Sequence, residues 1–270
     1  MSEQVFIDGE RAESLLPLRT LFYGEGVFET FRYKSRLPVF FPVHYQRMKR
    51  GAELLRIPIP EISGLSMQVR NAVEEAGYSD AYVKVCLLSQ GSSRFYDNPE
   101  KEAILVIIKE YSATKEPVKT LVHPVKRYSE SPLLRIKSMN YLENIAARRE
   151  AIEKGFDEAL FLNHRDEITE GSASNVFWFK DGVIFTPSLE CGLLPGITRD
   201  ILLNNIPELG IEVREGRYFP SDIIDSDFAF FTNSITGCSL ISRINDCNIS
   251  VDQRRYGDLK ELLIEKLKWS

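Results

Sequence analysis

Histidine and cysteine are sparse in this sequence. Its 270 residues include three histidines that lie far apart, at positions 44, 123 and 164, and four cysteines, none of them in a C-x-x-C pair. Because zinc ligands normally recur at close spacing, we expect no metal site. In a chain of this length, so few cysteines favour free thiols over a disulfide framework.

Long apolar runs and an excess of basic charge are also missing. The longest apolar run, 103–108, is far shorter than the ~20 residues of a membrane-spanning helix. The first residues lack the basic region and apolar stretch of a signal peptide. With 34 Lys and Arg against 39 Asp and Glu, the net charge is −5, which argues against a nucleic-acid partner. We therefore expect a cytoplasmic protein that contacts neither membranes nor nucleic acid.

Hydrophobic residues, by contrast, make up 43% of the chain, enough for a sizeable core. Apolar periodicity predicts strands at 4–9, 26–33, 81–88, 103–110, 118–125, 158–163, 174–179, 183–186 and 227–232. It predicts helices at 43–56, 61–76, 139–154, 196–205 and 255–268. Strands and helices mix without strict βαβ alternation, which favours the α+β class.

The predicted helix 139–154 and the segment after residue 111 bear on the organisation of the chain. Leu142, Ile145, Ala146 and Ile152 suggest a buried stripe on that helix. The polar segment 112–117 contains a proline and is the best candidate for a connection between domains. We expect three parts, listed here in order: an N-terminal domain at 1–115, a connection at 116–127 and a C-terminal domain at 128–270.

Two residues suggest covalent and acid–base chemistry. Lys137 lies where an apolar segment runs into a predicted helix, and a buried amine there would have a lowered pKa that frees its lone pair. Glu170 precedes small residues and then the apolar run 176–179, so its carboxylate has close access to a ligand. Taken singly, each also fits an ordinary surface lysine or a turn acid.

Other segments suggest anion binding. Pro195-Gly196 opens a helix whose first N–H groups, together with the Thr198 hydroxyl, suit a phosphate. The turn 232–237 contains the hydroxyls of Thr232, Ser234 and Thr236, any of which suits the same role. Arg47 shares a helix face with His44, and its guanidinium can bind phosphate through two hydrogen bonds. Arg94, in the loop 89–101, is a candidate for binding a substrate carboxylate. An amine, an acid and a phosphate cup together suit pyridoxal 5′-phosphate (PLP).

Several segments, in the same order along the chain, carry a specific resemblance. They are Tyr23–Thr30, His44-x-x-Arg47, Lys137–Leu142, Asp157–Leu160, Thr169–Phe177, Gly192–Arg199 and Thr232–Gly237. The chain thereby resembles the class IV aminotransferases, the fold-type IV PLP enzymes. This family includes branched-chain aminotransferases, D-amino-acid aminotransferases and 4-amino-4-deoxychorismate lyases.

The resemblance implies a fold and an assembly as well as roles for residues. It implies a small N-terminal α/β domain, a larger C-terminal pseudo-barrel domain, PLP between them and a homodimer with sites near the interface. Lys137 would bond the cofactor and move protons, and Glu170 would pair with the pyridine nitrogen. The remaining cofactor-binding residues would be Arg47, Tyr141, Ile197, Thr198 and a hydroxyl among Thr232, Ser234 and Thr236.

The motif nearest the substrate is most similar to the lyase-like members. Thr30 matches their threonine, and the loop Gln90–Tyr96 resembles their Arg-rich loop, although it equally resembles the carboxylate clamp of D-amino-acid aminotransferases. Gln90 replaces an arginine of that loop, which leaves the substrate open. For substrate binding we expect the side chains of Thr30, Arg32, Arg94 and Tyr96.

Three functions follow from this resemblance. The first is an aminodeoxychorismate lyase that forms 4-aminobenzoate and pyruvate for folate synthesis. The second is a transaminase of the D-amino-acid or branched-chain type, which acts on a small amino or carboxylate substrate. The third, a PLP-binding protein without turnover, is disfavoured because both Lys137 and Glu170 are present.

Overall fold

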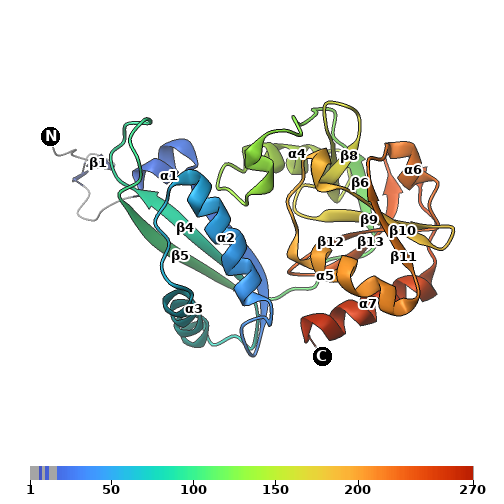
Figure 1. Cartoon of the computed structure of the whole chain (residues 1–270), viewed down its shortest axis with the longest axis horizontal. Coiled ribbons are helices and arrows are strands. Elements are labelled where there is room, and N and C mark those ends of the chain that lie inside the picture. Colours follow the sequence, from blue (N-terminus) through green and yellow to red (C-terminus); the bar gives the residue numbers. More distant parts are fainter. Residues whose placement is uncertain (1–5, 8–9, 12–16, 270) are drawn as a thin grey trace.

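Two sheets organise the chain in the structure, a computed structural model that describes residues 6–7, 10–11 and 17–269 (Figure 1). The first sheet is antiparallel, and its strands in spatial order are β3 (Gly26–Lys34), β4 (Asp80–Gln90) and β5 (Lys101–Glu110). Helices α2 (Phe41–Leu55) and α3 (Ile62–Ala76) cover one face of it. Before this sheet come the short pair β1 (Phe6–Ile7) and β2 (Glu10–Arg11) and the helix α1 (Leu18–Tyr23).

The second sheet is larger and curls into a half-barrel. Its spatial order is β11-β10-β9-β12-β13-β6-β7-β8, with β14 paired to β13. The strands, in chain order, are β6 (Val118–Val122), β7 (Glu158–Leu162), β8 (Ile168–Gly171), β9 (Asn175–Lys180), β10 (Val183–Pro187), β11 (Glu212–Gly216), β12 (Phe228–Asn233), β13 (Gly237–Ile244) and β14 (Cys247–Asn248). The helices are α4 (Leu142–Glu153), α5 (Ile197–Asn205), α6 (Pro220–Ile224) and α7 (Gln253–Leu267).

Both faces of this sheet are buried, as its sequence requires. Phe177 and Phe179 of β9 and Phe228 and Phe230 of β12 pack with α5 and α7 on one face. The alternate residues, such as Trp178, belong to a separate core on the other face. Because side chains of a strand alternate between faces, an apolar run such as 176–179 fits a strand that is covered on both sides.

Most predicted elements are confirmed, with end shifts of a few residues. The α+β class with a small sheet first and a half-barrel second is also confirmed. The predicted strand 4–9 lies mostly outside the described residues. The sequence analysis missed the strands β8, β11, β13 and β14 and the helices α1 and α6. The omission of β8 matters because Glu170 lies on it and not in a turn. The predicted division of the chain at 116–127 stays a prediction; β6 begins at Val118, within that range.

The predicted apolar stripe of helix 139–154 is wrong. Leu142 and Ile152 are exposed, at 75% and 58%, and Ala147 and Ala151 are the buried residues of α4. Small alanines let α4 lie close to β7, where they contact Ala159 and Phe161. The larger side chains therefore point outward, and α4 presents an apolar face to its surroundings.

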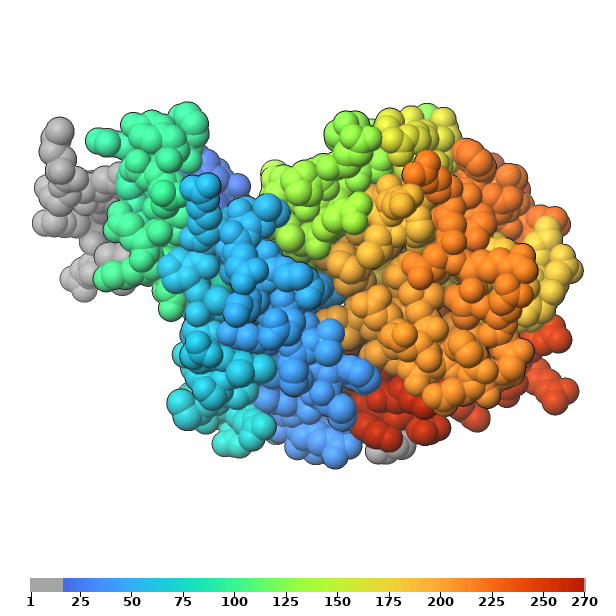
Figure 2. All heavy atoms as spheres, viewed as in Figure 1, coloured from blue at the N-terminus to red at the C-terminus, as the bar shows by residue number. Residues whose placement is uncertain are grey.

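The free edge of β3 joins the two sheets. At one end, the Phe28 N–H donates to the carbonyl of Lys137 at 2.8 Å, and the Met139 N–H donates to Gly26 at 2.8 Å. At the other end, the Arg32 N–H donates to the carbonyl of Ser234 at 3.0 Å. Figure 2 shows the two halves of the chain in contact, with the N-terminal half in blue and teal. A strand of the first half thus holds two segments of the second.

Cysteines, helix lengths and possible metal ligands can also be described from the structure. All four cysteines are free, and three of them are buried. Over residues 17–269, no helix is long and apolar enough to cross a membrane. In the same part of the chain, no group of three His, Cys, Asp or Glu side chains is placed to hold a metal ion.

Candidate active site

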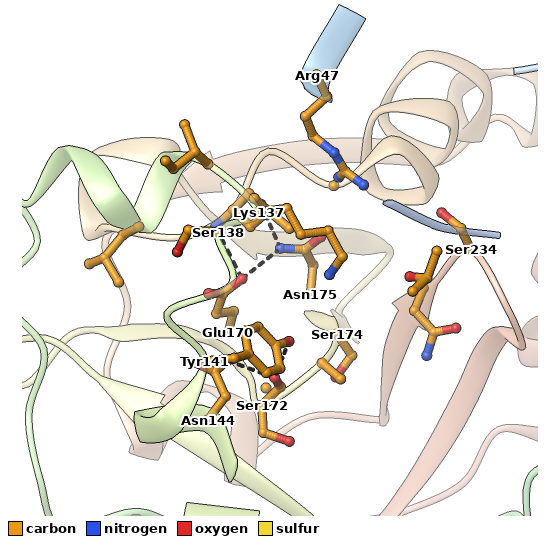
Figure 3. A pocket seen from close by; sticks show the side chains of 18 of the residues that line it. Arg47, Lys137, Ser138, Tyr141, Asn144, Glu170, Ser172, Ser174, Asn175 and Ser234 are labelled. Atoms are coloured by element: carbon orange, nitrogen blue, oxygen red, sulfur yellow. Dashed lines mark hydrogen bonds between the residues drawn. The ribbon is translucent and has the colours of Figure 1, made fainter. Parts of the chain in front are cut away.

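A cavity of about 270 Å³ lies where the free edge of β3 and helix α2 face the second sheet (Figure 3). Most of the predicted site residues line it, namely Thr30, Arg47, Lys137, Tyr141, Glu170, Ile197, Thr198, Thr232 and Ser234. In Figure 3, Arg47 reaches the cavity from α2 at the top and Ser234 lies at the right, whereas Glu170 and Tyr141 lie to the left. Segments from six parts of the chain therefore converge on one volume.

The amine of Lys137 enters this cavity beside an aromatic ring. Its backbone is held by β3, and its Nζ lies 4.5 Å from the centre of the Phe28 ring. Burial and, next, the nearby Arg47 guanidinium lower the pKa of Lys137 from its usual 10.5 to about 8. A substantial fraction of the amine is therefore neutral near pH 7.5, as nucleophilic chemistry requires.

The carboxyl group of Glu170 lies on β8, in which every residue is buried. Arg127 Nη1 donates to its Oε1 at 3.2 Å, and the Leu194 N–H donates to its Oε2 at 3.1 Å. Burial raises the pKa of Glu170 to about 7, although Arg127 opposes the shift. A buried carboxyl with a raised pKa on a cavity wall is typical of a functional site.

Arg47 is fixed from behind by a buried acid, Glu29 of β3. Arg47 donates from Nε and Nη2 to the two oxygens of Glu29, at 2.8 and 2.6 Å, and from Nη1 to the carbonyl of Pro195 at 3.0 Å. His44 lies 2.7 Å from the same carboxylate. Burial alone would raise the pKa of Glu29, but Arg47 and His44 hold it at about 2. The remaining N–H groups of Arg47 are thus oriented before any ligand arrives.

The start of α5 and the turn after β12 supply hydrogen-bond groups to the cavity. Residues 196–198 and 232–234 line it, and no side chain caps the first turn of α5. Thr198 Oγ1 lies 3.2 Å from Ser234 Oγ, and Thr232 Oγ1 is buried without a hydrogen-bond partner among the described residues. Free N–H groups at a helix start, beside hydroxyls and an arginine, bind anions.

Gly196 precedes the first residue of α5, and the reason for a glycine there is packing and not backbone conformation. Its φ of −74° is open to any residue. A Cβ at this position would lie 1.8 Å from Oδ1 of Asn175, whose Nδ2 donates to the carbonyl of Leu194 at 3.0 Å. Glycine is therefore required here by close packing beneath the start of α5.

Tyr141 forms the wall beside Glu170. Its hydroxyl donates to the carbonyl of Ser172 at 2.8 Å, and its ring meets Phe28 edge to face at 5.3 Å. Burial raises the pKa of Tyr141, so the phenol stays protonated at neutral pH and acts as a donor. The cavity thus combines an amine, a buried acid, a phenol and an anion cup.

This combination is matched by a known family. A family model described as amino-transferase class IV matches residues 26–244, most of the chain. The chain belongs to the class IV aminotransferase family. Members of this family are PLP-dependent lyases and transaminases, and the chain is an enzyme of that group.

Individual class IV aminotransferases are similar along most of the chain. The aminodeoxychorismate lyase of Bacillus subtilis (strain 168) is 29% identical over 254 residues, which cover 90% of this chain and 86% of that protein. The branched-chain-amino-acid aminotransferase of Escherichia coli (strain K12) is 29% identical over 252 residues, which cover 88% and 81%. A solved Legionella pneumophila structure, described provisionally as a 4-amino-4-deoxychorismate lyase, has a TM-score of 0.89 and 29% identity, covering 96% and 98%.

Four predicted residues of this class IV aminotransferase lie outside the cavity. Arg32 points to the other side of the turn 232–237 and pairs with Asp80, and Thr236 lines that side as well. Arg94 and Tyr96 are on the exposed loop between β4 and β5, and Tyr96 is 68% exposed. Arg32 shares a face of β3 with Thr30 but lies two residues farther along the strand, at the point where β3 meets the turn 232–237, and only Thr30 of this strand lines the cavity.

The charged residues near the cavity that were missed include Glu29, Lys84 and Arg127. Glu29 lies between Val27 and Phe31 on the helix-covered face of β3, and an acid on a buried face was a usable signal of a paired charge. Lys84 lies opposite Thr30 in the sheet register, with its Nζ 4.2 Å from the Phe28 ring. Arg127 stacks over Phe161 at 3.3 Å, and nothing in the sequence around it indicated a contact with the acid on β8.

Proposed function

We propose that this class IV aminotransferase is a PLP-dependent lyase that converts 4-amino-4-deoxychorismate to 4-aminobenzoate and pyruvate, a reaction of folate synthesis. The observation that carries the proposal is the cavity that brings Lys137 and Glu170 together with an anion cup. The lyase reaction is favoured by the names of the B. subtilis relative and of the L. pneumophila structure. Thr30 at the cavity wall supports it too.

The residues of the cavity fit PLP as a ligand. The phosphate would be held by Arg47, the first N–H groups of α5, and the hydroxyls of Thr198 and Ser234. The buried Thr232 hydroxyl lacks a hydrogen-bond partner among the described side chains, which a phosphate oxygen would supply. Glu170 and Tyr141 would bond the ring at the opposite end. Bound there, PLP would supply an electron-accepting ring that stabilises negative charge at a substrate carbon.

The residues of the chain have distinct tasks in this reaction. Lys137 would bond the cofactor and, once the substrate amine has replaced it, its Nζ would take the proton from the amine-bearing carbon. Glu170 would accept a hydrogen bond from the protonated pyridine nitrogen and so keep that nitrogen protonated. The ion pair with Arg127 favours the ionised carboxylate that this role requires. After this proton is lost to Lys137, the C–O bond between the ring and the enolpyruvyl group would break and the ring would become aromatic. The enolpyruvate that leaves would take up one proton to become pyruvate.

Carboxylates of the substrate need cations at the mouth of the cavity. Lys84 lies just outside the cavity lining, opposite Thr30 and half-buried, with its Nζ 4.2 Å from the same Phe28 ring that Lys137 approaches to 4.5 Å. None of the carboxylates in residues 17–269 forms an ion pair with it. We assign it to a substrate carboxylate. Arg94 and Tyr96 do not line the cavity of their own chain, so a role for them in substrate binding requires that they act across a homodimer interface.

The proposed assembly is a homodimer, located in the cytoplasm. The apolar face of α4 supports it, because Leu142, Ile145 and Ile152 are exposed on a single chain. A second copy that covers part of this face would bury apolar area, which is favourable by about 25 cal/mol per Å². Sedimentation at micromolar protein should give twice the monomer mass, and a monomer would remove Arg94 and Tyr96 from substrate binding.

The alternative function is a transaminase, and a specific observation favours it. The E. coli branched-chain-amino-acid aminotransferase is as similar in identity, at 29%, as the B. subtilis lyase. Cavity residues that hold the cofactor serve both reactions, since each begins with removal of a proton from an amine-bearing carbon. The groups that contact the substrate must therefore decide between them.

One pair of assays separates the two functions. Purified enzyme loaded with PLP is incubated with 4-amino-4-deoxychorismate and, separately, with a panel of L- and D-amino acids that report half-transamination. We expect 4-aminobenzoate and pyruvate in equal amounts and slow reaction with the amino acids. Rapid transamination without 4-aminobenzoate would establish the alternative. Lys137→Ala should abolish product, and Thr30→Val should lower turnover while PLP binding persists.

A further inference from the structure

Arg32, which was expected to contact the substrate, is enclosed on the far side of the turn 232–237. Its Nε and Nη2 donate to both oxygens of Asp80, at 2.7 and 2.5 Å. One face of its guanidinium lies 3.6 Å from the centre of the Tyr111 ring, and Trp269 lies 5.0 Å away. An arginine stacked on aromatic rings and paired with a carboxylate is fixed in place. It cannot reach a substrate without breaking all three contacts.

Trp269 brings the end of the chain to the same place. It follows α7 and is only 7% exposed. A Cβ on Gly237 would lie 3.2 Å from Cζ3 of its indole, so the ring packs directly beneath the first residue of β13. The ammonium of Lys34 donates to the Trp269 carbonyl. Figure 2 shows the red C-terminal segment against the blue N-terminal half.

These contacts converge on the turn that faces the candidate active site. The backbone N–H of Arg32 donates to the carbonyl of Ser234, whose hydroxyl meets Thr198 inside the cavity. Gly237, at the end of the same turn, rests on Trp269. The turn is therefore supported from behind by both halves of the chain, while its hydroxyls point to the anion cup.

A second cavity, of about 330 Å³, lies behind the turn and explains why support is needed. Arg32, Thr236, Gly237 and Trp269 are among the residues that line it. Because this space is not filled by side chains, the turn has room to retreat from the anion cup. The stacked pair of Arg32 and Trp269 closes one side of that space.

We propose that Arg32 and Trp269 form a clasp that positions the turn 232–237 for phosphate. They are positioning residues. Trp269 packs against Gly237 directly, and the Arg32 side chain acts through its contacts with Trp269, Tyr111 and Asp80, which hold the indole and the strand that bonds Ser234. The proposal rests on the proposed function, because it takes the phosphate of PLP as the anion. It predicts that the clasp contributes to phosphate affinity and leaves the chemistry of Lys137 unchanged.

The test compares two ligands that differ only in the phosphate. Apo full-length enzyme is titrated with PLP and with pyridoxal, and binding is followed by the visible absorbance of the covalent complex. For Arg32→Met and Trp269→Ala we expect PLP affinity to fall about tenfold, ~1.4 kcal/mol, with pyridoxal affinity unchanged. Inorganic phosphate should also protect apo wild type from heat more than it protects either variant. Trp269→Phe, which keeps a ring, should restore most of the PLP affinity.

A matched control distinguishes the clasp from loss of any stacked arginine. Arg243 stacks over Phe156 at 5.5 Å and pairs with Asp246, away from the turn. Arg243→Met should leave both affinities unchanged. If Arg32→Met loses PLP and pyridoxal affinity equally, or loses neither, the clasp proposal is wrong. If Trp269→Ala does not fold, the result for Arg32→Met alone tests the proposal. A wild type that binds PLP no better than pyridoxal would instead overturn the proposed function.

Discussion

Replacing Lys137 with methionine should make the apo enzyme more stable at neutral pH. Burial and the Arg47 guanidinium lower the pKa of Lys137 from 10.5 to about 8, so the folded state disfavours the charged amine. At 1.36 kcal/mol per pKa unit, this difference amounts to about 3 kcal/mol. It is an upper limit, because Lys137 keeps partial exposure to the cavity. Methionine is similar in length and removes the charge.

The sign and the pH range follow from proton linkage. Below about pH 8 the amine is charged in both the folded and the unfolded chain, and the full penalty is present. Between about 8 and 10.5 the folded amine is neutral while the unfolded one is still charged, so the penalty shrinks. Above 10.5 it vanishes. The advantage of Lys137→Met over wild type should therefore fall from about 3 kcal/mol near pH 7 to below about 1 kcal/mol near pH 10.

Urea unfolding of the two apo proteins at several pH values measures this difference. Lys49→Met is the matched control, because Lys49 is exposed on α2 and its replacement should change stability little at any pH. An advantage of the same size at every pH would mean that methionine merely packs better. If Lys137→Met is no more stable than wild type near pH 7, the inference that the folded protein destabilises the charged form of Lys137 is refuted.

Three further predictions concern the other charged groups. Because burial raises the pKa of Glu170 from 4.5 to about 7, apo Glu170→Gln should be more stable than wild type above pH 7, and this gain should fade towards pH 4.5. The PLP-loaded variant should lose turnover ~100-fold, and undiminished turnover would remove Glu170 from the mechanism. Glu29→Gln leaves Arg47 and His44 without their carboxylate, so the free energy of unfolding, measured by thermal unfolding, should fall by about 3 kcal/mol. Titration should show at least tenfold weaker PLP binding, and unchanged PLP affinity would contradict the inference that Glu29 positions Arg47. Lys84→Met should raise KM for 4-amino-4-deoxychorismate about tenfold with PLP affinity unchanged, and an unchanged KM would exclude its contact with a carboxylate.

The reactive groups could be proposed from the sequence only as a set. Lys137, Glu170 and the start of α5 each also fitted an ordinary surface or turn position, but together they suited PLP, and the structure places them around one cavity. Spacing alone could not predict this meeting, since contacts between residues 30, 137 and 234 depend on how β3 docks on the second half. The resemblance to a family supplied that information in advance.

Errors arose where burial was inferred from periodicity alone. The leucine and isoleucines of α4 suggested an inward stripe, but close packing against β7 selected Ala147 and Ala151. Arg32 belonged to a motif near the substrate, yet strand geometry and aromatic partners from distant parts of the chain place it behind the turn. Both errors concern long-range packing, which a local pattern does not encode.

The edge of β3 sets a fixed distance between two anchors of the candidate active site. Phe28 holds the lysine segment and Arg32 holds the turn 232–237, four residues farther along the same strand. At about 3.3 Å per residue, the strand fixes these anchors ~13 Å apart, whatever the second sheet does. One residue inserted between them would displace one anchor by ~3.3 Å and send every later side chain to the opposite face. Residues can therefore be added at the ends of β3, but an insertion or deletion between Phe28 and Arg32 would disrupt the site.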